Sequence, residues 1–379
     1  MKVLVTGADG FIGKNLCLHL AERNGLELIR FTRDNSLEQL AELAAQADFV
    51  VHLAGINRPQ DPQEFQQGNA GLTRALCDAL QQSGRKTPVI FSSSIQGGRD
   101  NAYGKSKRSA EQAVFGYGEA TGAPVYVYRL PNVFGKWARP NYNSAVATFC
   151  NNISQGLPIQ IKDPAATIRL VYVDDVIESF LQAMQGNVPV CGFVSIVPEY
   201  SISVGALAKQ IQAFKESRDT LITDNVGTGL VRALYSTYVS YLKPEQFTYH
   251  VPKYGDQRGV FVEMLKTPEA GQFSFFTAHP GITRGGHYHH SKTEKFLVIK
   301  GRACFRFRHM FTGEFYELHT SGEQPEIVET VTGWTHDITN VGDDEMVVML
   351  WANEIFDREK PDTYACPVGI GACRKVGTP

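Results

Sequence analysis

Three histidines and one glutamate in the last third of the sequence have the donor atoms and the spacing of a metal site. These residues are His287, His289, Glu294 and His336. On a strand, residues two positions apart face the same side, so His287 and His289 are expected to point together into a barrel. Glu294 is expected from the adjacent strand and His336 from the opposite one, while His290 faces away. Three imidazoles and a carboxylate suit a divalent metal, with zinc favoured over iron, manganese or nickel. A solvated histidine-rich loop is the alternative.

A second group of residues can reduce a carbonyl. Hydride addition leaves an oxygen that needs a proton, and Tyr103 can donate it if a nearby charge lowers its pKa. Lys107 stands one helical turn later and supplies such a charge, and it can also bind the hydroxyls of a ribose. Ser94 ends a run of three serines and can hydrogen-bond the substrate oxygen. We therefore predict Ser94, Tyr103 and Lys107 as catalytic residues.

A glycine turn near the N-terminus is placed to bind a dinucleotide. Gly7, Gly10 and Gly13 follow an apolar strand and open a helix, which allows a tight turn and brings a pyrophosphate to the helix N-terminus. The alternative is a purely structural turn. The predicted cofactor-binding residues are Gly7, Gly10, Phe11, Ile12, Gly13, Arg33, Leu53, Ala54, Tyr103 and Lys107.

The residues after the second apolar run favour NADPH over NADH. An NAD site usually has Asp or Glu there to bind the ribose 2′-hydroxyl, whereas Thr32 is neutral and Arg33 could pair with a 2′-phosphate. Asp34 follows directly and argues the other way. An ordinary surface arginine at position 33 is the alternative.

Short apolar runs alternate with helical patterns through the first half of the chain. Strands are expected at Lys2–Gly7, Leu26–Thr32, Asp48–Gly55, Pro88–Ser94 and Pro124–Leu130, with a helix from about Phe11 to Asn24. The strand-like runs carry Val, Ile and aromatic residues on both faces, as buried parallel strands do. Strands that alternate with helices predict an α/β Rossmann-type fold with a doubly wound parallel sheet.

The pattern changes after about Tyr241, where helical periodicity fades and short strand-like runs recur between Gly, Pro and Thr. These runs are 261–267, 273–279, 294–301, 303–310, 314–320 and 344–351. Many short strands with turn signals predict an all-β sandwich or barrel. We place the boundary between residues 243 and 244, with a reductase domain and its substrate lobe over 1–243 and a β domain over 244–379.

Composition and charge narrow the function further. The chain has 379 residues, a formal net charge of −2 and no long charged run, so we expect neither a nucleic-acid partner nor a polybasic membrane anchor. No apolar run approaches the ~20 residues that cross a bilayer, and no signal-peptide pattern opens the sequence. Seven dispersed cysteines suit free thiols in a reducing compartment. We therefore expect a cytoplasmic enzyme.

The chain before the predicted boundary resembles the extended short-chain dehydrogenase/reductase (SDR) family. The shared motifs are TGADGFIG at 6–13, HLAG at 52–55, the serines at 92–94, YGKSK at 103–107, RLPNVFG at 129–135 and RLVYVDDV at 169–176. The resemblance implies that the third serine, Ser94, is the catalytic one. It also places Asn132 and Arg169 where relatives contact the substrate and its diphosphate. A turn residue and a surface salt bridge are the respective alternatives. Ser94 and Tyr103 are closer than is usual in the family, so the loop between them is expected to be short.

The segment with the metal-site residues resembles the cupin family. It matches the first cupin motif, G-x5-HxH-x4-E-x6-G, at every fixed position from Gly281 to Gly301. Gly333–Asn340 matches the second motif, with Val331 where proline is usual. The resemblance implies that the β domain is a cupin barrel, in which a metal could clamp the strands or polarise a carbonyl oxygen.

Two segments also resemble the dTDP-4-keto-6-deoxysugar epimerases, which are cupins that act on keto-sugars. They are Asp256–Gly259 and Arg284–Tyr288. The catalytic base of these epimerases matches His287, which here lies in the metal-ligand pattern, and Phe356 stands near the expected place of their general-acid tyrosine. Other proton carriers are therefore needed, and the candidates are Asp256, Lys295 and Tyr288.

An SDR domain joined to such a cupin resembles the bifunctional epimerase/reductases of capsular and O-antigen polysaccharide biosynthesis, which supply the N-acetyl-L-fucosamine precursor. The resemblance covers nearly the whole chain. It implies that the cupin inverts C3 of UDP-2-acetamido-2,6-dideoxy-4-hexulose and that the SDR domain reduces the C4 ketone with NADPH to UDP-2-acetamido-2,6-dideoxy-L-talose. It also implies a UDP-sugar partner and a homodimer. The alternatives are a single-activity reductase with a structural or dimerising cupin module, and a redox-sensing regulator on an inactive SDR fold.

Overall fold

The structure is a computed structural model, and it describes residues 1–59, 61, 63–188, 192–251, 253–256, 259–262, 265, 267, 271–354 and 359–369. These residues form two compact units. The first comprises Met1–Val133 and Arg169–Tyr200, and the second comprises Phe134–Ile168 and the described residues from Ser201 onward. Segments of the expected substrate lobe thus group with the β-rich part of the chain. The predicted domain boundary between residues 243 and 244 stays a prediction.

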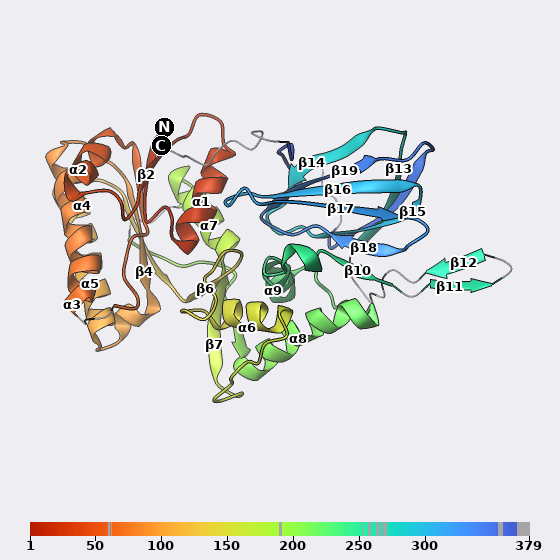
Figure 1. Ribbon diagram of the computed structural model, residues 1–379. Coiled ribbons are helices and arrows are strands. Elements are labelled where there is room, and N and C mark those ends of the chain that lie inside the picture. The colour runs from red at the N-terminus through yellow and green to blue at the C-terminus, as the bar shows by residue number, and fades with distance from the viewer. Residues whose placement is uncertain are drawn as a thin grey trace. The chain divides into compact units, whose positions relative to one another are not determined.

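Six parallel strands form the main sheet of the first unit (Figure 1). In spatial order they are β2 (Glu27–Phe31), β1 (Lys2–Thr6), β3 (Phe49–His52), β4 (Val89–Ser94), β5 (Val125–Leu130) and β8 (Gly192–Val194). The strand order reverses at β1, because β2 lies on one side of it and β3 on the other. Such a switch point is where doubly wound sheets bind ligands, at the carboxyl ends of the strands. The predicted parallel, Rossmann-like sheet is confirmed.

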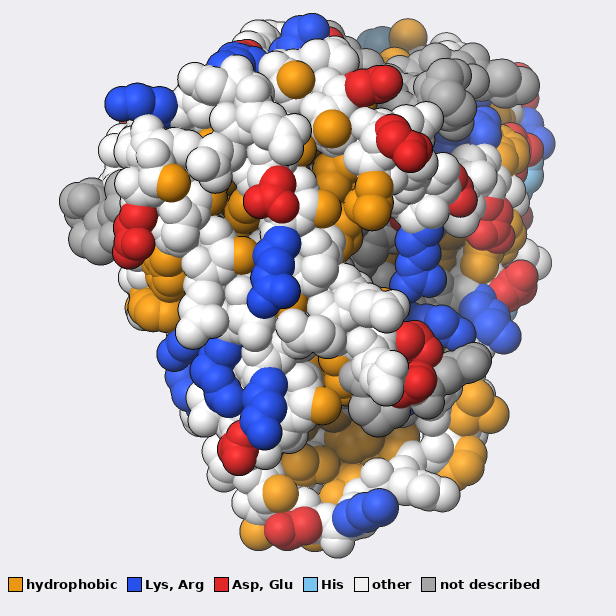
Figure 2. Space-filling view, turned by 90° about the vertical axis from the view of Figure 1, so that its left-hand side faces the viewer, with side chains coloured by type: hydrophobic (Ala, Val, Ile, Leu, Met, Phe, Trp, Pro, Cys, Tyr) orange, Lys and Arg blue, Asp and Glu red, His pale blue; other side chains and the backbone are white. Residues whose placement is uncertain are grey.

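Helices cover both faces of this sheet, which explains why its strands are apolar on both sides. Figure 1 shows α2 (Leu37–Gln46), α4 (Leu72–Gln82) and α5 (Ala102–Thr121) on one face, and α1 (Phe11–Ala21) and α7 (Val173–Met184) on the other. The core under the first group includes Leu4, Phe31, Leu40, Leu76, Leu80 and Phe91. Acidic and basic side chains are interspersed over the face seen in Figure 2, with apolar side chains between them.

Short elements complete the first unit and lead into the second. They are α3 (Gln63–Phe65), the π-helical turn η1 (Gln66–Gly71), the 3₁₀ turn η2 (Ile95–Gly98) and a small sheet of β6 (Asn132–Phe134), β7 (Thr167–Tyr172) and β9 (Tyr200–Ser203). The helices of the second unit are α6 (Ala145–Ser154), α8 (Val204–Thr220), α9 (Gly229–Val239) and the 3₁₀ turn η3 (Pro244–Gln246).

Two five-stranded antiparallel sheets form the rest of the second unit. The first contains β10 (Thr248–His250), β18 (Glu326–Glu329), β15 (Glu294–Lys300), β20 (Met346–Ala352) and β13 (Gln272–Ala278). The second contains β17 (Phe315–Ser321), β16 (Arg302–His309), β19 (Trp334–Asn340), β14 (Thr283–Tyr288) and β21 (Tyr364–Ala365). Their inner faces meet where Phe296 packs against Phe305, with ring centres 5.6 Å apart. The predicted all-β region is confirmed; that it is a cupin barrel stays a prediction.

A hairpin of β11 (Lys253–Asp256) and β12 (Gly259–Val262) precedes these sheets, and part of the expected strand over 261–267 lies outside the described residues.

The expectation that all cysteines are free thiols is wrong for one of them. Cys17, Cys77, Cys150 and Cys304 are free, whereas Cys366 is disulfide-bonded, which its spacing along the sequence did not indicate. Among the described residues, no helix combines the length and the apolar character needed to cross a bilayer.

Candidate functional site

The predicted dinucleotide turn lies at the carboxyl end of β1, beside the switch point. Gly7 has a φ of +69°, and a Cβ atom there would lie 2.8 Å from the backbone nitrogen of Ala54. A Cβ atom on Gly13 would lie 2.1 Å from the carbonyl oxygen of Gly7, so only glycine lets α1 pack this closely on the turn. In this described segment no side chain caps α1 at Gly10, which leaves amides of its first turn for an anion.

Leu53 and Ala54 follow β3 and face the same turn. Their backbone amides both donate to Oγ1 of Thr6, each at 3.2 Å. Thr6 Oγ1 also lies 2.6 Å from Nδ1 of His52, whose Nε2 lies 2.8 Å from Oγ1 of Thr73. Burial lowers the pKa of His52 to about 3, so its ring is neutral. His52, the histidine of the HLAG motif, therefore links the carboxyl ends of β1 and β3 to Thr73 on α4.

Arg33 lies exposed just after β2, at the same edge of the sheet as the glycine turn. The structure adds Arg30, which the sequence did not single out. Its guanidinium forms an ion pair with Asp9, a residue inside the glycine turn. Arg30 lies within β2, and its position in the sequence does not distinguish it from an ordinary strand residue.

Ser94, Tyr103 and Lys107 come together, as their predicted roles require. Ser94 is the last residue of β4, and its side chain lies close enough to Tyr103, near the start of α5, to affect the pKa of that residue. Burial raises the pKa of Tyr103 and the side chain of Ser94 opposes this rise, so the hydroxyl keeps its proton at neutral pH. This differs from the expected lowering, because burial has the largest effect on the pKa of Tyr103.

Lys107 is buried with its charge close to the tyrosine. Its Nζ donates to the carbonyl of Ser92 at 3.1 Å and lies 6.0 Å from the ring centre of Tyr103. Burial lowers the pKa of Lys107 to about 8, although Glu111 opposes the shift. The short η2 turn is what brings the end of β4 and the start of α5 together, in agreement with the expected short loop.

Glu111 is a supporting residue that sequence reasoning missed. Its buried carboxylate accepts a hydrogen bond from Oγ of Ser93 at 2.5 Å. It also accepts two from Arg129, at 2.9 and 2.6 Å. The available signal was its position, one helical turn after Lys107 on α5. This glutamate fixes the serine strand and the Tyr-Lys helix relative to each other.

The two predicted substrate residues lie on neighbouring strands and are both exposed. Nδ2 of Asn132 donates to the carbonyl of Arg169 at 2.9 Å. The guanidinium of Arg169 forms a two-pronged ion pair with Glu199, and Nη2 lies 2.8 Å from Oε2. This contact raises the pKa of Arg169 and lowers that of Glu199. The salt-bridge alternative for Arg169 therefore describes the structure as it stands, and a diphosphate would have to replace Glu199.

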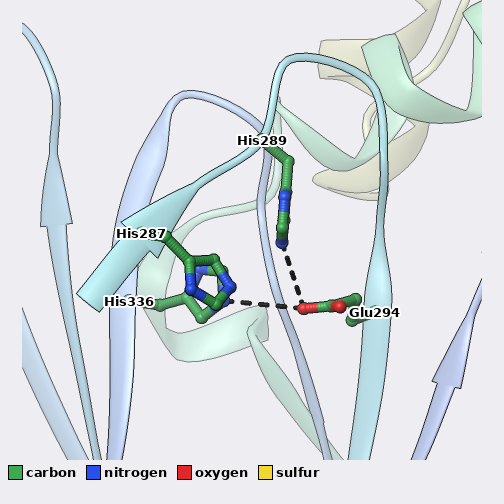
Figure 3. A group of neighbouring side chains, drawn as sticks. All are labelled: His287, His289, Glu294 and His336. Carbon is green, nitrogen blue, oxygen red and sulfur yellow. Dashed lines mark hydrogen bonds and ion pairs between the residues drawn. The ribbon is translucent and has the colours of Figure 1, made fainter. Parts of the chain in front are cut away.

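The four predicted metal ligands converge inside the second unit (Figure 3). Their ligand atoms all lie within 4.8 Å of one another. His287 is on β14, His289 follows the end of that strand, Glu294 begins β15 and His336 is on β19. The expected strand assignment was reversed, however. His336 pairs directly with His287 in the same sheet, and Glu294 comes from the other sheet, because the chain crosses between sheets from β14 to β15.

The electrostatics of this cluster fit a bound cation. Nε2 of His289 lies 3.1 Å from Oε2 of Glu294, and Nε2 of His336 lies 3.6 Å from the same oxygen. Within the described residues neither ring nitrogen of buried His336 has a hydrogen-bond partner, and leaving such a group unpaired is costly. Burial lowers the pKa of His287 to about 3 and lowers that of His336, which keeps both rings neutral. Burial opposes ionisation of Glu294, but its contacts with His289 and His336 hold its pKa well below the usual value. Neutral imidazoles around a carboxylate are the donor set of a divalent metal.

A cavity of about 220 Å³ adjoins His287, Glu294 and His336. Its remaining walls are mostly apolar and are formed by Phe276, Phe296, Phe305, Ile338 and Leu350, with Arg284 among them. The guanidinium of Arg284 lies 5.0 Å from the ring centre of Phe276 and donates to the carbonyl of Thr277 at 3.0 Å. The cavity therefore opens onto three of the four clustered side chains.

The candidate proton carriers fare differently. Lys295 points away from the ligands, because it alternates with Glu294 along β15, and its Nζ pairs with Glu329 and with Tyr249 Oη at 3.0 Å. Tyr288 is buried against Tyr364, with ring centres 5.5 Å apart. Neither is among the residues described as lining the cavity. The side chain of Asp256 and all of Phe356 lie outside the described residues.

Known proteins resemble both parts of the chain. Residues 3–190 match the NAD dependent epimerase/dehydratase family, and residues 254–364 match the polysaccharide biosynthesis C-terminal domain. A UDP-2-acetamido-2,6-beta-L-arabino-hexul-4-ose reductase of Pseudomonas aeruginosa is 62% identical over 372 residues, which cover 98% of this chain and 100% of the relative.

Solved structures extend the likeness over both units. The capsular polysaccharide assembling protein CapF from Staphylococcus aureus is 39% identical, with a TM-score of 0.67, over 97% of this chain and 100% of that one. A structure of CapF with the inhibitor 3-isopropenyl-tropolone is 37% identical, with a TM-score of 0.62, over the same shares. A UDP-glucuronic acid 4-epimerase from Bacillus cereus is 22% identical over 57% of this chain and 83% of that one, with a TM-score of 0.51, and supports the fold alone.

Proposed function

Because the chain belongs to the family of the Pseudomonas UDP-2-acetamido-2,6-beta-L-arabino-hexul-4-ose reductase and of CapF, we propose that it is a bifunctional nucleotide-sugar enzyme. Family membership makes it a UDP-sugar ketone reductase of capsule polysaccharide biosynthesis that uses a nicotinamide cofactor. The proposal adds that a cupin site first inverts C3 of UDP-2-acetamido-2,6-dideoxy-4-hexulose. Reduction of the C4 ketone by NADPH then gives UDP-2-acetamido-2,6-dideoxy-L-talose in the cytoplasm, in a homodimer.

The convergence of Ser94, Tyr103 and buried Lys107 carries the reductase half of the proposal. A bound nicotinamide supplies the hydride for the C4 carbon. As the C4 oxygen gains charge, Tyr103 donates its hydroxyl proton to it, and Ser94 orients the same oxygen by a hydrogen bond. The ammonium of Lys107 stabilises the tyrosinate that remains until solvent returns a proton.

Two further roles follow from the edge of the parallel sheet. Arg33 would pair with the 2′-phosphate that distinguishes NADPH from NADH, since it is exposed beside the glycine turn. Asn132 and Arg169 would bind the sugar and its diphosphate. A diphosphate offers a planar guanidinium more charge than one carboxylate does, so Arg169 could exchange Glu199 for substrate.

The unpaired nitrogens of His336 beside Glu294 carry the epimerase half. A C3 hydrogen next to a ketone becomes acidic when the neighbouring oxygen can take up the charge of the enolate. A divalent metal, with zinc favoured, held by His287, His289, Glu294 and His336 would supply Lewis-acid polarisation of that ketone. The cavity beside three of these side chains would exclude water from the sugar.

The two proposed reactions, epimerisation at C3 and reduction at C4, are chemically coupled. Epimerisation is reversible and needs the C4 ketone, so it must come before reduction. Reduction removes the ketone, fixes the configuration at C3 and draws the epimerisation forward. This coupling gives a reason for one chain to hold both sites.

The inhibitor described for CapF points to a further property of the proposed metal site. A tropolone carries adjacent carbonyl and hydroxyl oxygens, a pair that chelates divalent metals. We expect 3-isopropenyl-tropolone to block C3 exchange in this protein while leaving reduction of an already epimerised substrate intact. Equal inhibition of both reactions would place its target outside the four-ligand cluster.

Product analysis tests the proposal as a whole. The protein is incubated with NADPH and the UDP-4-keto sugar, and the product is identified by NMR. The proposal predicts a C4 alcohol with inverted C3. A reduced product with its original C3 configuration would favour the alternative of a single-activity reductase with a structural or dimerising cupin module. If the substrate were not reduced at all, the result would favour the alternative of a redox-sensing regulator on an inactive SDR fold.

A further inference from the structure

Asp362 holds the loop that carries one of the four metal ligands. This ligand loop, residues 289–293, connects β14 to β15. The carboxylate of Asp362 accepts three backbone N–H groups in succession, from His290 at 2.9 Å and from Ser291 and Lys292 at 2.7 Å each. It also accepts the hydroxyl of Ser291 at 3.1 Å. Successive amides gathered on one carboxylate form short, charge-assisted bonds, which fix the path of the loop.

The same residue fixes the orientation of the His289 ring. The backbone carbonyl of Asp362 hydrogen-bonds with Nδ1 of His289, and since a carbonyl can only accept, Nδ1 carries the hydrogen. In the neutral ring this leaves the lone pair on Nε2, the nitrogen that faces Oε2 of Glu294 at 3.1 Å. Asp362 thus acts on His289 through both its side chain and its backbone.

The residues after Asp362 extend this hold to the other ligands. Oγ1 of Thr363 lies 3.0 Å from Nζ of Lys292, which in turn lies 3.4 Å from Oε1 of Glu294. The next two residues form β21, which pairs with His287 and Tyr288 at the end of β14. One short segment therefore touches the surroundings of three ligands.

We propose that Asp362 is a positioning residue that shapes the ligand loop before the metal binds and thereby sets the metal affinity. This inference rests on the metal site of the proposed function. A preshaped loop spares the metal the cost of ordering His289 and its neighbours. Outer residues that orient metal-bound histidines typically change metal affinity about 10–100-fold when replaced. The competing view is that Asp362 only anchors the end of the chain.

Asp362→Asn separates these views, because asparagine keeps the shape but loses the charge and one acceptor oxygen. Zinc affinity of the full-length, metal-stripped protein is measured by competition with a chromophoric chelator. The expected dissociation constant is about 10–100-fold higher than that of the unmodified protein. The cobalt form should show a weaker or shifted d–d absorption. Asp343→Asn is the matched control, since that carboxylate is fully exposed and pairs only loosely with Arg302 at 3.5 Å, and it should bind zinc normally.

Thermal unfolding of the metal-free proteins shows whether the variant is folded. If Asp362→Asn is unfolded, Asp362→Glu replaces it, because the longer side chain keeps the charge but displaces the carboxylate from the three amides, and it should also bind zinc more weakly. A folded variant that binds zinc within twofold of the unmodified protein overturns the inference and leaves the metal site standing. An unmodified protein that binds less than half an equivalent of any divalent metal overturns both.

Discussion

Nε2 of His289 and Oε2 of Glu294 face each other at 3.1 Å in a buried part of the second unit (Figure 3). The opposite ring nitrogen, Nδ1, is committed to the carbonyl of Asp362, so Nε2 is the nitrogen of the neutral ring that can bind a metal. A cation between Nε2 and the carboxylate, either a proton or a metal ion, stabilises the pair. The pair is thus arranged for a metal, which leads to the first prediction.

His289→Gln should lose the metal and the C3 exchange together. Metal analysis of the unmodified protein should give about one equivalent, because the four side chains form one ligand set. The variant should keep NADPH-dependent reduction of a substrate already inverted at C3. His319→Gln, which changes an exposed histidine outside the cluster, is the control, with circular dichroism to check the fold. A folded, metal-free variant with full exchange activity would refute a catalytic metal.

Tyr103→Phe should abolish the proton donor and keep the ring in place. Reduction of the 4-keto sugar should fall by about 10²–10⁴-fold, while NADPH should still bind. Stopped-flow measurement of NADPH oxidation gives the rate, and fluorescence titration gives the binding. Tyr117→Phe is the matched control on the same helix, since its hydroxyl donates to the carbonyl of Thr87 at 2.8 Å, away from Ser94 and Lys107. Near-normal reduction by the Tyr103 variant would assign the proton to another residue.

Arg33→Ala should raise the KM for NADPH much more than that for NADH. The reason is that only NADPH carries the 2′-phosphate that the guanidinium would bind. Steady-state kinetics with both cofactors measure the change. Arg85→Ala serves as control, because Arg85 pairs with Asp48 at the amino end of the strands, away from the cofactor edge. If the unmodified protein used NADH with the same efficiency as NADPH, or with a higher one, the assignment would be contradicted.

The pKa of about 8 at Lys107 predicts weaker NADPH binding in alkaline buffer. Burial lowers this pKa from the ordinary lysine value of 10.5, so the ammonium loses its proton as the pH rises through about 8. Loss of that charge removes a partner of the ribose and of the tyrosinate. Stability has the opposite sign: the depressed pKa makes folding more favourable as the pH rises from about 8 toward 10.5.

Titration of the cofactor-free protein with NADPH between pH 7 and 9.5 measures this effect. Lys107→Met should bind NADPH weakly at every pH in the range. Lys105→Met, which changes an exposed lysine on the same helix, should follow the unmodified protein. A binding constant that does not vary across this range in the unmodified protein would show that the lysine keeps its proton.

The sequence predicted the parallel sheet well, because its buried strands are short apolar runs whose ends are marked by glycine and serine. Local spacing also grouped His287, His289 and Glu294, and the Tyr-Lys pair, since each of these sets lies within one or two neighbouring elements. It could not tell which sheet each strand joins, and so it reversed the positions of Glu294 and His336.

Contacts between residues that are distant in sequence could not be predicted from local spacing either. Glu199 binds Arg169 from 30 positions away, and Asp362 reaches the ligand loop from more than 70 positions away. Neither residue belongs to a motif. Such contacts are set by how the chain returns to a site, which depends on the whole fold.

Exchange of the C3 hydrogen with solvent deuterium tests the two-site account most directly. Tyr103→Phe protein is mixed with UDP-2-acetamido-2,6-dideoxy-4-hexulose in D₂O without NADPH, and deuterium at C3 is followed by NMR. The account predicts incorporation at close to the rate of the unmodified protein, because the reductase residue takes no part in epimerisation, and loss of incorporation when a chelator strips the metal. The contradicting result is that neither the folded, metal-loaded variant nor the unmodified protein incorporates deuterium at C3. That result would leave the β domain without a catalytic role.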